Sequence, residues 1–200
     1  MPRKKKVMAK AEQRERTRRR LVALAREEFG KRGYAGVSTE RLVARAKLTR
    51  GALYHQFPDK QALFRAALED AQGDIVAAIG KAVAEATDEW AVLRDGCHAF
   101  LEAASRPELK RILLIDGPAV LGWEEWRRID DENGIEELRV GLQDLMNKGV
   151  IREGPVAALA AMLSGAMNDG ALWIAAAADR DTALREAGAT MDLLLEGLRV

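Results

Sequence analysis

The sequence has few of the residues that form disulfides and metal sites, and it has no long apolar run. It contains one cysteine, Cys97, and two histidines among 200 residues, so an internal disulfide is impossible and no recognised metal-ligand spacing is assembled. The longest stretch without a charge, from Gly154 to Asn168, is shorter than the roughly 18 apolar residues of a membrane span. No apolar segment follows the basic start, as a secretion signal requires. We therefore expect a cytoplasmic protein that has no cofactor, no metal and no contact with a membrane.

Charge is distributed unevenly along the chain, although the net charge is only +1. Residues 1–60 hold 18 Lys and Arg against 6 Asp and Glu, whereas residues 61–200 hold 14 against 25. A basic segment is typical of a surface that meets a polyanion such as nucleic acid, although a merely solvated basic face is the alternative. The asymmetry therefore favours two parts with different tasks.

The spacing of apolar residues predicts an all-α protein. Aromatic residues make up 5% of the chain and 35 residues are alanine, while apolar residues recur every three or four positions, as they do on helices. The first ten residues lack this periodicity and are expected to form a flexible basic arm. A helix is expected from about Ala11 to Gly30 or Gly33, since glycine often ends helices. The other expected helices are 39–46, 50–55, 59–85, 88–104, 107–115, 122–131, 133–148, 155–178 and 181–198.

Two short helices separated by about three residues, with a third helix before them, are the architecture of a helix-turn-helix. In the second short helix Leu53 and Phe57 can face inward, which leaves its polar residues free to enter a groove. Arg50 can donate two hydrogen bonds to guanine, and Gly51 leaves room for the duplex. Lys60, at the start of the next helix, is placed to bind a phosphate. The predicted DNA-binding residues are Thr39, Thr49, Arg50, Gly51, Tyr54, His55 and Lys60.

Residues 11–68 resemble the DNA-binding domain of the TetR (tetracycline repressor) family of bacterial regulators. The most specific string is TRGALYHQFPDKQAL, from Thr49 to Leu63. The resemblance implies a homodimer with two helix-turn-helix heads and a helical C-terminal domain that binds a small inducer. The family usually has Gly where this chain has Lys47, and a small residue where it has Val43. We therefore expect Lys47 to adopt a strained turn and Val43 to need more room between the helices.

These expectations divide the chain into four parts. Residues 1–10 are the flexible basic arm, and residues 11–58 are the helix-turn-helix DNA-binding domain. Residues 59–85 form a connector helix. Residues 86–200 are expected to form a helical domain for ligand binding and dimerisation.

The aromatic residues of the C-terminal part suggest a ligand cavity. All four tryptophans lie after residue 87, and aromatic side chains with a few polar groups commonly line such cavities. Few charged residues are interspersed with them, which favours a largely apolar effector. Ordinary core packing or a dimer surface is the alternative role for each residue. The predicted ligand-binding residues are Trp90, Phe100, Trp123, Trp126, Asn168 and Trp173.

Apolar stripes on the last two helices predict a dimer interface. Small residues permit close approach, so these helices from two subunits can form a four-helix interface, and the family resemblance implies dimer contacts there. Burial within the same subunit is the alternative. The predicted interface residues are Leu159, Leu163, Ala166, Met191, Leu194, Leu195 and Leu198.

Evidence for catalysis is weak in this sequence. Its carboxylates cluster as continuous runs at residues 124–125, 130–132 and 136–137, which is typical of solvated helix surfaces.

We therefore interpret the chain as a dimeric repressor, not an enzyme. It is expected to bind a pseudo-palindromic operator in double-stranded DNA and to leave it when a small effector binds. One alternative is a DNA-binding regulator that is controlled by a protein partner or by its own abundance. A helical enzyme with a basic tail is the more remote alternative.

Overall fold

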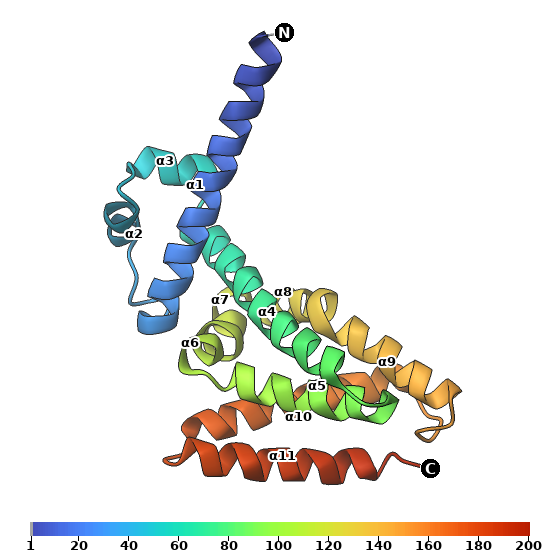
Figure 1. Ribbon diagram of the computed structural model, residues 1–200. Coiled ribbons are helices and arrows are strands. Elements are labelled where there is room, and N and C mark those ends of the chain that lie inside the picture. The colour runs from blue at the N-terminus through green and yellow to red at the C-terminus, as the bar shows by residue number, and fades with distance from the viewer. Residues whose placement is uncertain (1) are drawn as a thin grey trace.

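The computed structural model describes residues 2–200, apart from the side chains of residues 2–10 and of Asn133. The described chain is built from α-helices, as predicted. A small head lies at the upper left of Figure 1, and a larger C-terminal part lies below it. Helix α4 (Lys60–Glu85) joins them, running from the head along the C-terminal part.

Helix α1 (Pro2–Arg32) is longer than the sequence indicates. It begins at Pro2 and not near Ala11, so the backbone of the expected flexible arm continues the helix. Lys, Met and Ala favour helices, and the fixed φ of Pro suits the first helical position, which explains the correction. The helix ends as expected before Gly33, whose φ of +71° an L side chain rarely adopts.

The head is completed by α2 (Thr39–Ala46) and α3 (Arg50–Gln56). The remaining helices lie close to the predicted ranges, but the expected helices 107–115 and 133–148 each include a π-helical turn, which apolar spacing alone does not reveal. These helices are α5 (Glu89–Ala104), α6 (Pro107–Lys110), η1 (Arg111–Asp116, π-helical), α7 (Gly117–Leu121), α8 (Trp123–Asp130), η2 (Asp131–Ile135, π-helical), α9 (Glu136–Asn147), α10 (Val156–Ala176) and α11 (Arg180–Glu196).

Two hydrophobic cores hold the helices together, and the first crosses the expected domain boundary. Phe29 of α1 and Phe64 of α4 meet edge to face at 5.2 Å between ring centroids. The same core includes Ile112 of η1 and Trp126 of α8, so it extends from the head into the C-terminal part. A second core joins α5, α9, α10 and α11. Helix α1 of the head is packed against α6 and η1 as well as against the connector helix.

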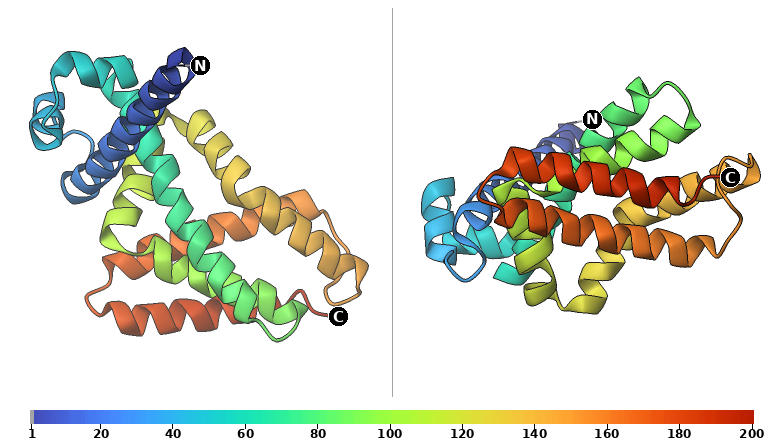
Figure 2. Two further views of the ribbon diagram at one scale, coloured as in Figure 1. Left: turned by 45° about the horizontal axis from the view of Figure 1, so that its top comes forward. Right: turned by 90° about the horizontal axis from the view of Figure 1, so that it is seen from below.

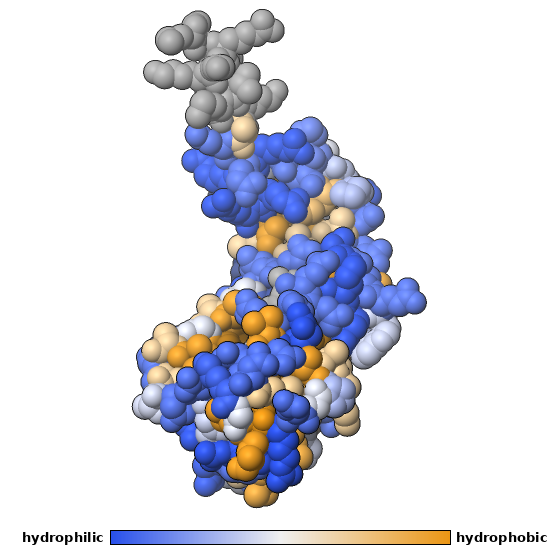
Figure 3. All heavy atoms as spheres, turned by 90° about the vertical axis from the view of Figure 1, so that its right-hand side faces the viewer, coloured by the Kyte–Doolittle hydropathy of each residue, from blue (hydrophilic) through white to orange (hydrophobic). Residues whose placement is uncertain are grey.

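Helices α10 and α11 run side by side along the bottom of the molecule (Figure 2, right). On the face shown in Figure 3, hydrophobic residues appear between hydrophilic ones in the lower, C-terminal part, while the described head above is mostly hydrophilic. Among residues 2–200 we find no helix with the length and apolarity to cross a bilayer.

Candidate DNA-binding face and ligand cavity

A side chain caps the start of each of the two helices α2 and α3. Ser38 Oγ accepts a hydrogen bond from the backbone N of Arg41 at 3.2 Å, and Thr49 Oγ1 accepts one from the backbone N of Ala52 at 3.2 Å. Such caps satisfy amide groups that a helix start leaves unpaired. Between the two helices Lys47 adopts φ 52° and ψ 45°, the left-handed conformation that the resemblance implies for a position where the family usually has Gly. The structure thus confirms the strained turn expected at this position.

Helix α3 separates its buried and exposed residues as the sequence predicts. Leu53 is 0% exposed and Phe57 is 2% exposed, so both belong to the head's core. A Cβ on Gly51 would have only Thr49 Oγ1 nearby, at 4.0 Å, so the space above this glycine is open to a duplex. The predicted groove-facing residues of α3 and its cap are all exposed: Thr49, Arg50, Gly51, Tyr54 and His55.

Three predicted DNA-binding residues from two helices come together at this face. The Arg50 guanidinium lies 5.6 Å from the centre of the Tyr54 ring. Hydrogen bonds from Arg50 and then Thr39 lower the pKa of the Tyr54 hydroxyl. Glu40 pairs with Arg50 at 3.5 Å. The structure therefore groups Thr39, at the start of α2, with α3 in one exposed polar cluster.

Lys60 lies at the start of α4, as predicted, but it is not a freely exposed cation. Its Nζ sits 4.0 Å from the centre of the Tyr34 ring, and burial lowers the pKa of its ammonium group. Asp59 caps the same helix start by accepting a hydrogen bond from the backbone N of Ala62 at 2.7 Å. The aromatic ring therefore holds Lys60 beside the end of α3.

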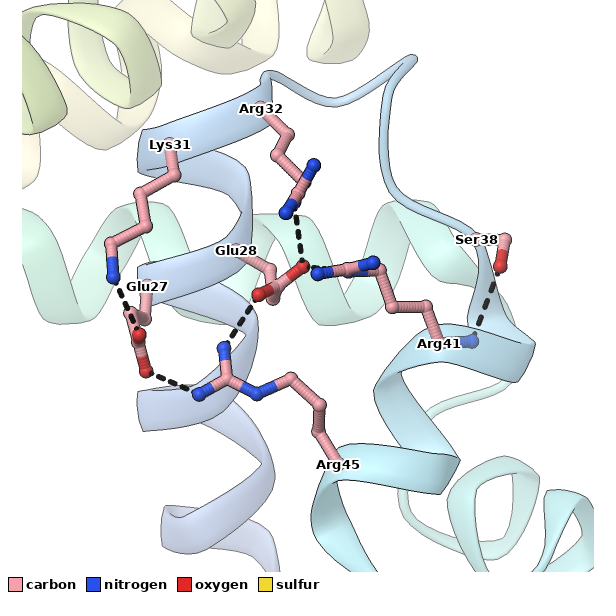
Figure 4. A network of polar contacts seen from close by, with 7 residues as sticks. All are labelled: Glu27, Glu28, Lys31, Arg32, Ser38, Arg41 and Arg45. Carbon is pink, nitrogen blue, oxygen red and sulfur yellow. Dashed lines mark hydrogen bonds and ion pairs between the residues drawn. The ribbon is translucent and has the colours of Figure 1, made fainter.

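A buried carboxylate, Glu28, fixes α2 against α1 (Figure 4). Its side chain is 3% exposed, and it binds Arg41, Arg45 at 2.5 Å and Arg32 at 3.3 Å. The hydrogen bond from Arg41 lowers the pKa of Glu28 most, burial opposes it, and Arg45 lowers it further. These arginines therefore stabilise the head, although the basic composition alone does not distinguish them from DNA contacts.

Arg18 is a positioning residue that sequence analysis did not single out. Its guanidinium lies 4.4 Å from the centre of the Phe57 ring and donates to the backbone oxygen of Gln56 at 3.4 Å. The contact ties α1 to the end of α3. The sequence gives no pattern that identifies this role, because Arg18 belongs to a dense run of arginines without apolar periodicity.

The C-terminal part encloses a cavity of about 420 Å³. Its walls come from α4, α5, η1, α8, η2, α9 and α10, and they are mostly apolar. Val76 and Val92, each 38% exposed, lie where the lining meets solvent. A hollow of this size and character is typical of small-molecule sites.

The structure brings only half of the predicted ligand-binding residues to this cavity. Phe100, Trp126 and Asn168 line it. Trp123 and Trp173 are 64% and 51% exposed and lie outside the lining. Trp90 also lies outside and packs beneath the Arg199 guanidinium at 4.8 Å. An aromatic residue type does not reveal which side of its helix faces inward, and this explains the three misplacements.

A short path connects the cavity wall to the head. Trp126 Nε1 donates a 2.7 Å hydrogen bond to the backbone oxygen of Leu113, and both residues line the cavity. Further along η1, Asp116 Oδ2 accepts a 2.8 Å hydrogen bond from the backbone N of Tyr34. Gly30 allows α1 to approach α6, because a Cβ there would lie 2.9 Å from the Cβ of Glu108.

The predicted dimer stripe points largely into the chain's own core. Leu163, Met191 and Leu195 are at most 6% exposed, so they are not available to a partner in this arrangement. The second core also partly buries Leu159, Ala166 and Leu198. Only Leu194 of the predicted set is strongly exposed, at 51%. The apolar stripe that the sequence shows is therefore mainly the inward side of α10 and α11.

The outward side of these two helices is also apolar, and of its residues sequence analysis assigned only Leu194 to the dimer interface. Met162 and Leu193 are each 75% exposed, and Trp173 and Leu194 are each 51% exposed. Gly165, between Met162 and Trp173 on α10, is also exposed. We call Met162, Gly165, Trp173, Leu193 and Leu194 the outer α10–α11 face. Because both sides of these helices carry apolar residues, periodicity did not separate the two roles.

Both parts of the chain match models of known families. Residues 21–67 match "Bacterial regulatory proteins, tetR family", and residues 90–198 match "Tetracyclin repressor-like, C-terminal domain". The HTH-type transcriptional repressor AcnR of Corynebacterium diphtheriae is 34% identical over 128 residues. That match spans 61% of this chain and 63% of the relative, which is less than two thirds of the relative's length.

Solved structures share the fold. A TetR-family regulator from Pectobacterium atrosepticum is 38% identical, with a TM-score of 0.79, and the match covers 94% of this chain and 96% of that chain. RolR in complex with resorcinol is 19% identical, with a TM-score of 0.71, and shares the fold over 94% of this chain and 90% of its own. The helix-turn-helix, the family models and the similarity to the Pectobacterium protein agree: the chain belongs to the TetR family of DNA-binding transcriptional regulators.

Proposed function

We propose that the protein is a cytoplasmic, dimeric repressor that leaves its operator when a largely apolar effector fills the cavity. Family membership supports the DNA-binding part, and the exposed cluster around Arg50 and Tyr54 supplies groups for base and phosphate contacts. AcnR, a relative over part of its length, is named as a repressor. Repression, the operator and the effector are the parts that experiments must test.

The single observation that carries the effector proposal is the continuity between the cavity wall and the head. Leu113 lines the cavity, and Asp116 in the same π-helical turn holds the backbone of Tyr34. A ligand that moves η1 therefore changes how the head is docked. Such a ligand releases DNA only if it binds the DNA-incompetent arrangement better than the competent one.

The cavity favours this proposal over a regulator without an effector. Control by a protein partner or by abundance needs no apolar hollow inside the C-terminal part, whereas a sensor of small molecules does. RolR, which has the same fold, is described in complex with resorcinol, a small aromatic molecule. The same fold can thus hold a small ligand.

The outer α10–α11 face supports the proposed homodimer. It presents large apolar residues on two neighbouring helices, and solvation of such a patch is unfavourable unless a partner covers it. A two-fold dimer presents two α3 helices, so we expect a pseudo-palindromic operator with half-sites about 35 Å apart.

A regulatory role without catalysis is part of the same proposal. Most carboxylates of the acidic runs lie on helix surfaces, although Asp130 and Glu137 line the cavity, and several pair with neighbouring arginines. Arg128 binds Glu125 at 2.9 Å and Glu132 at 2.5 Å, for example. Ion pairs of this kind are typical of a solvated helix surface.

Selection of duplexes from a random pool, followed by titration of the selected operator with and without candidate effectors, tests the proposal. We expect one pseudo-palindromic sequence to be enriched and an effector to weaken its binding. Trp126→Phe keeps an aromatic ring but removes the donor to Leu113, so it should reduce the response to effector while leaving operator affinity in place. Equal binding of selected and scrambled duplexes by the unaltered protein would refute the proposed function.

A further inference from the structure

The wall of the cavity contains hydrogen-bond acceptors that the protein does not use. Gln72 of α4 is 8% exposed and lines the cavity, and its Oε1 accepts no hydrogen bond from any residue that the structure describes. Asp130 Oδ2, at the end of α8, is also buried and receives no hydrogen bond from the side chains and backbone that the structure describes. Buried polar atoms in folded proteins nearly always have a partner. Two open acceptors in one cavity wall therefore point to a donor carried by a ligand.

The surroundings of Asp130 favour a positively charged donor. Arg127 Nη1 lies 3.6 Å from Asp130 Oδ2, which is too long for a hydrogen bond, and the same guanidinium also pairs with Asp131 at 3.4 Å. Burial raises the pKa of Asp130, the charge of Arg127 lowers it, and the charge of Asp131 raises it. Hydrogen bonds to the carboxyl group from Asn168 and Ser164 of α10 lower it further, while the Oδ2 atom stays without one. A cation beside Asp130 would offset the unfavourable burial of its charge.

The charge of the whole lining also discriminates between ligands. Glu89, Glu137 and Asp144 line the cavity together with Asp130, and the described lining contains no Lys, Arg or His. Lys148 approaches Glu89 and Asp144 at 3.2 and 2.8 Å without belonging to the lining. An anionic ligand would lose its hydration and meet carboxylates without a cation in the wall. The lining therefore disfavours carboxylates as ligands.

We propose that this cavity binds a largely apolar molecule that carries a protonated amine, with the ammonium beside Asp130 and N–H groups directed at the open acceptors of the wall. The apolar walls accommodate the hydrocarbon part of such a molecule. This inference rests on the proposed function, because it names the chemical class of the effector for the same cavity. An alcohol on the same skeleton binds less tightly, since it donates a hydrogen bond without a charge.

Three probes that share one skeleton test the class of ligand: 4-phenylbutylamine, 4-phenylbutan-1-ol and 4-phenylbutanoate. Each is titrated into the full-length protein near neutral pH, and both the binding isotherm and the thermal unfolding midpoint are measured. We expect the amine to bind most tightly and to raise the midpoint most, the alcohol to bind about tenfold more weakly, and the carboxylate to show the least effect. A carboxylate that matches the amine overturns the proposal, and so does an amine without detectable binding.

Two substitutions test whether Asp130 and Gln72 bind the ligand. Asp130→Asn keeps the shape of the side chain but removes its charge, so the amine should lose about tenfold or more in affinity while the alcohol changes by less than about threefold. Gln72→Met keeps the chain length but removes the acceptor, so both probes should bind a few times more weakly. Asp131→Asn is the matched control, because Asp131 is next in the chain and pairs with the same arginine but does not line the cavity.

The outcomes for these variants are separable. Amine binding that is unchanged in both Asp130→Asn and Gln72→Met overturns the proposal, as does an equal loss in Asp131→Asn. If Asp130→Asn does not fold, the probe series and Gln72→Met still decide the matter. The selection of an operator from random duplexes is measured without any of the three probes. If the protein shows no preference for one DNA sequence, that result therefore refutes the proposed function and does not test the class of ligand. An effector that releases DNA from this cavity but is a carboxylate leaves that function standing and overturns the ligand class.

Discussion

Two carboxylates, a buried one in the head and a half-buried one in the cavity wall, have different surroundings. Glu28 in the head contacts the guanidinium groups of Arg32, Arg41 and Arg45. Asp130 in the cavity wall has one guanidinium at 3.6 Å and an Oδ2 atom without a hydrogen bond from the described residues. The head satisfies its buried charge from within the chain. The cavity wall keeps an acceptor open, as a site for an external molecule requires.

Packing differs between the two parts in the same way. In the head, Phe29, Tyr34 and Phe64 contact one another with centroids 5.2 to 5.8 Å apart. The C-terminal part instead has a cavity of about 420 Å³ among its helices. A part that presents a recognition helix benefits from being rigid, whereas a part that senses a small molecule needs space and unmet polar groups.

The largest expected effect concerns the outer α10–α11 face. Leu193→Glu together with Leu194→Glu places charges on exposed apolar positions, so we expect monomers and a loss of at least about a hundredfold in operator affinity, because two linked heads bind DNA far better than one. Light scattering and operator titration measure the two effects. Val140→Glu, at an exposed position on α9 outside this face, is the control. A double variant that remains dimeric shows that the interface lies elsewhere.

The contrast between the two carboxylates can be tested directly by urea unfolding. Glu28→Gln should lower the free energy of unfolding by about 2 kcal/mol, since a buried, charge-assisted network loses its acceptor. Asp130→Asn should change it by less than about 1 kcal/mol, because that carboxyl group is half-buried with an open oxygen. Equal losses in both variants would remove the distinction between the two regions.

DNA recognition should depend on the head alone. Arg50→Ala should weaken operator binding by roughly tenfold or more and reduce the preference for one base, since Arg is a common bidentate donor to guanine. Probe binding in the cavity should remain unchanged. Titrations of matched and mismatched operators measure the specificity, and Lys110→Ala, a basic side chain on α6 outside the proposed DNA-binding face, is the control. A uniform loss on every duplex would assign Arg50 to phosphate contacts.

Glu28 should make the stability of the protein depend on pH in the acidic range. Folding lowers the pKa of Glu28, so its contribution is present at pH values above the ordinary Glu pKa and is lost as the pH falls through the lowered value. The difference in stability between the parent and Glu28→Gln should therefore shrink as the pH falls below the ordinary Glu pKa of 4.5. Urea midpoints across this range measure it, and a constant difference contradicts the assignment.

The smallest effect is expected at Trp123. This side chain is 64% exposed and lies outside the cavity lining, although its ring centroid is 5.1 Å from that of Trp126. Trp123→Ala should change probe affinity and operator affinity by less than about threefold each. Fluorescence titration measures the first and a gel-shift assay measures the second. If Trp123→Ala loses as much of the effector response as Trp126→Phe does, Trp123 contributes to ligand binding after all.

The head was predictable because its signals are local. Two short capped helices and the three residues that link them need only neighbouring residues to form. Within 49–57, the helical spacing of four residues separates Leu53 and Phe57 from the exposed positions. The left-handed conformation of Lys47 was expected from the family resemblance, since the family usually has Gly at this position. The fold class and the helix-turn-helix were therefore accessible without tertiary structure.

The C-terminal site was less predictable because its helices are apolar on more than one side. Leu163 and Met162 are adjacent on α10, yet one is 6% and the other 75% exposed. Residue type alone did not show which would be buried. The same ambiguity moved Trp173 from the predicted cavity to the outer face and left Phe100 and Trp126 in the lining.

The sequence by itself determined the all-α class, the helix-turn-helix and the contrast between a basic start and an acidic remainder, because helix periodicity, caps and charge are properties of neighbouring residues. Only the tertiary structure decided which side chains surround the cavity, that η1 connects its wall to Tyr34, and that Gln72 and Asp130 keep open acceptors. Each of these depends on contacts between residues that are distant in the chain. No local pattern encodes the distance between such residues, and packing sets it.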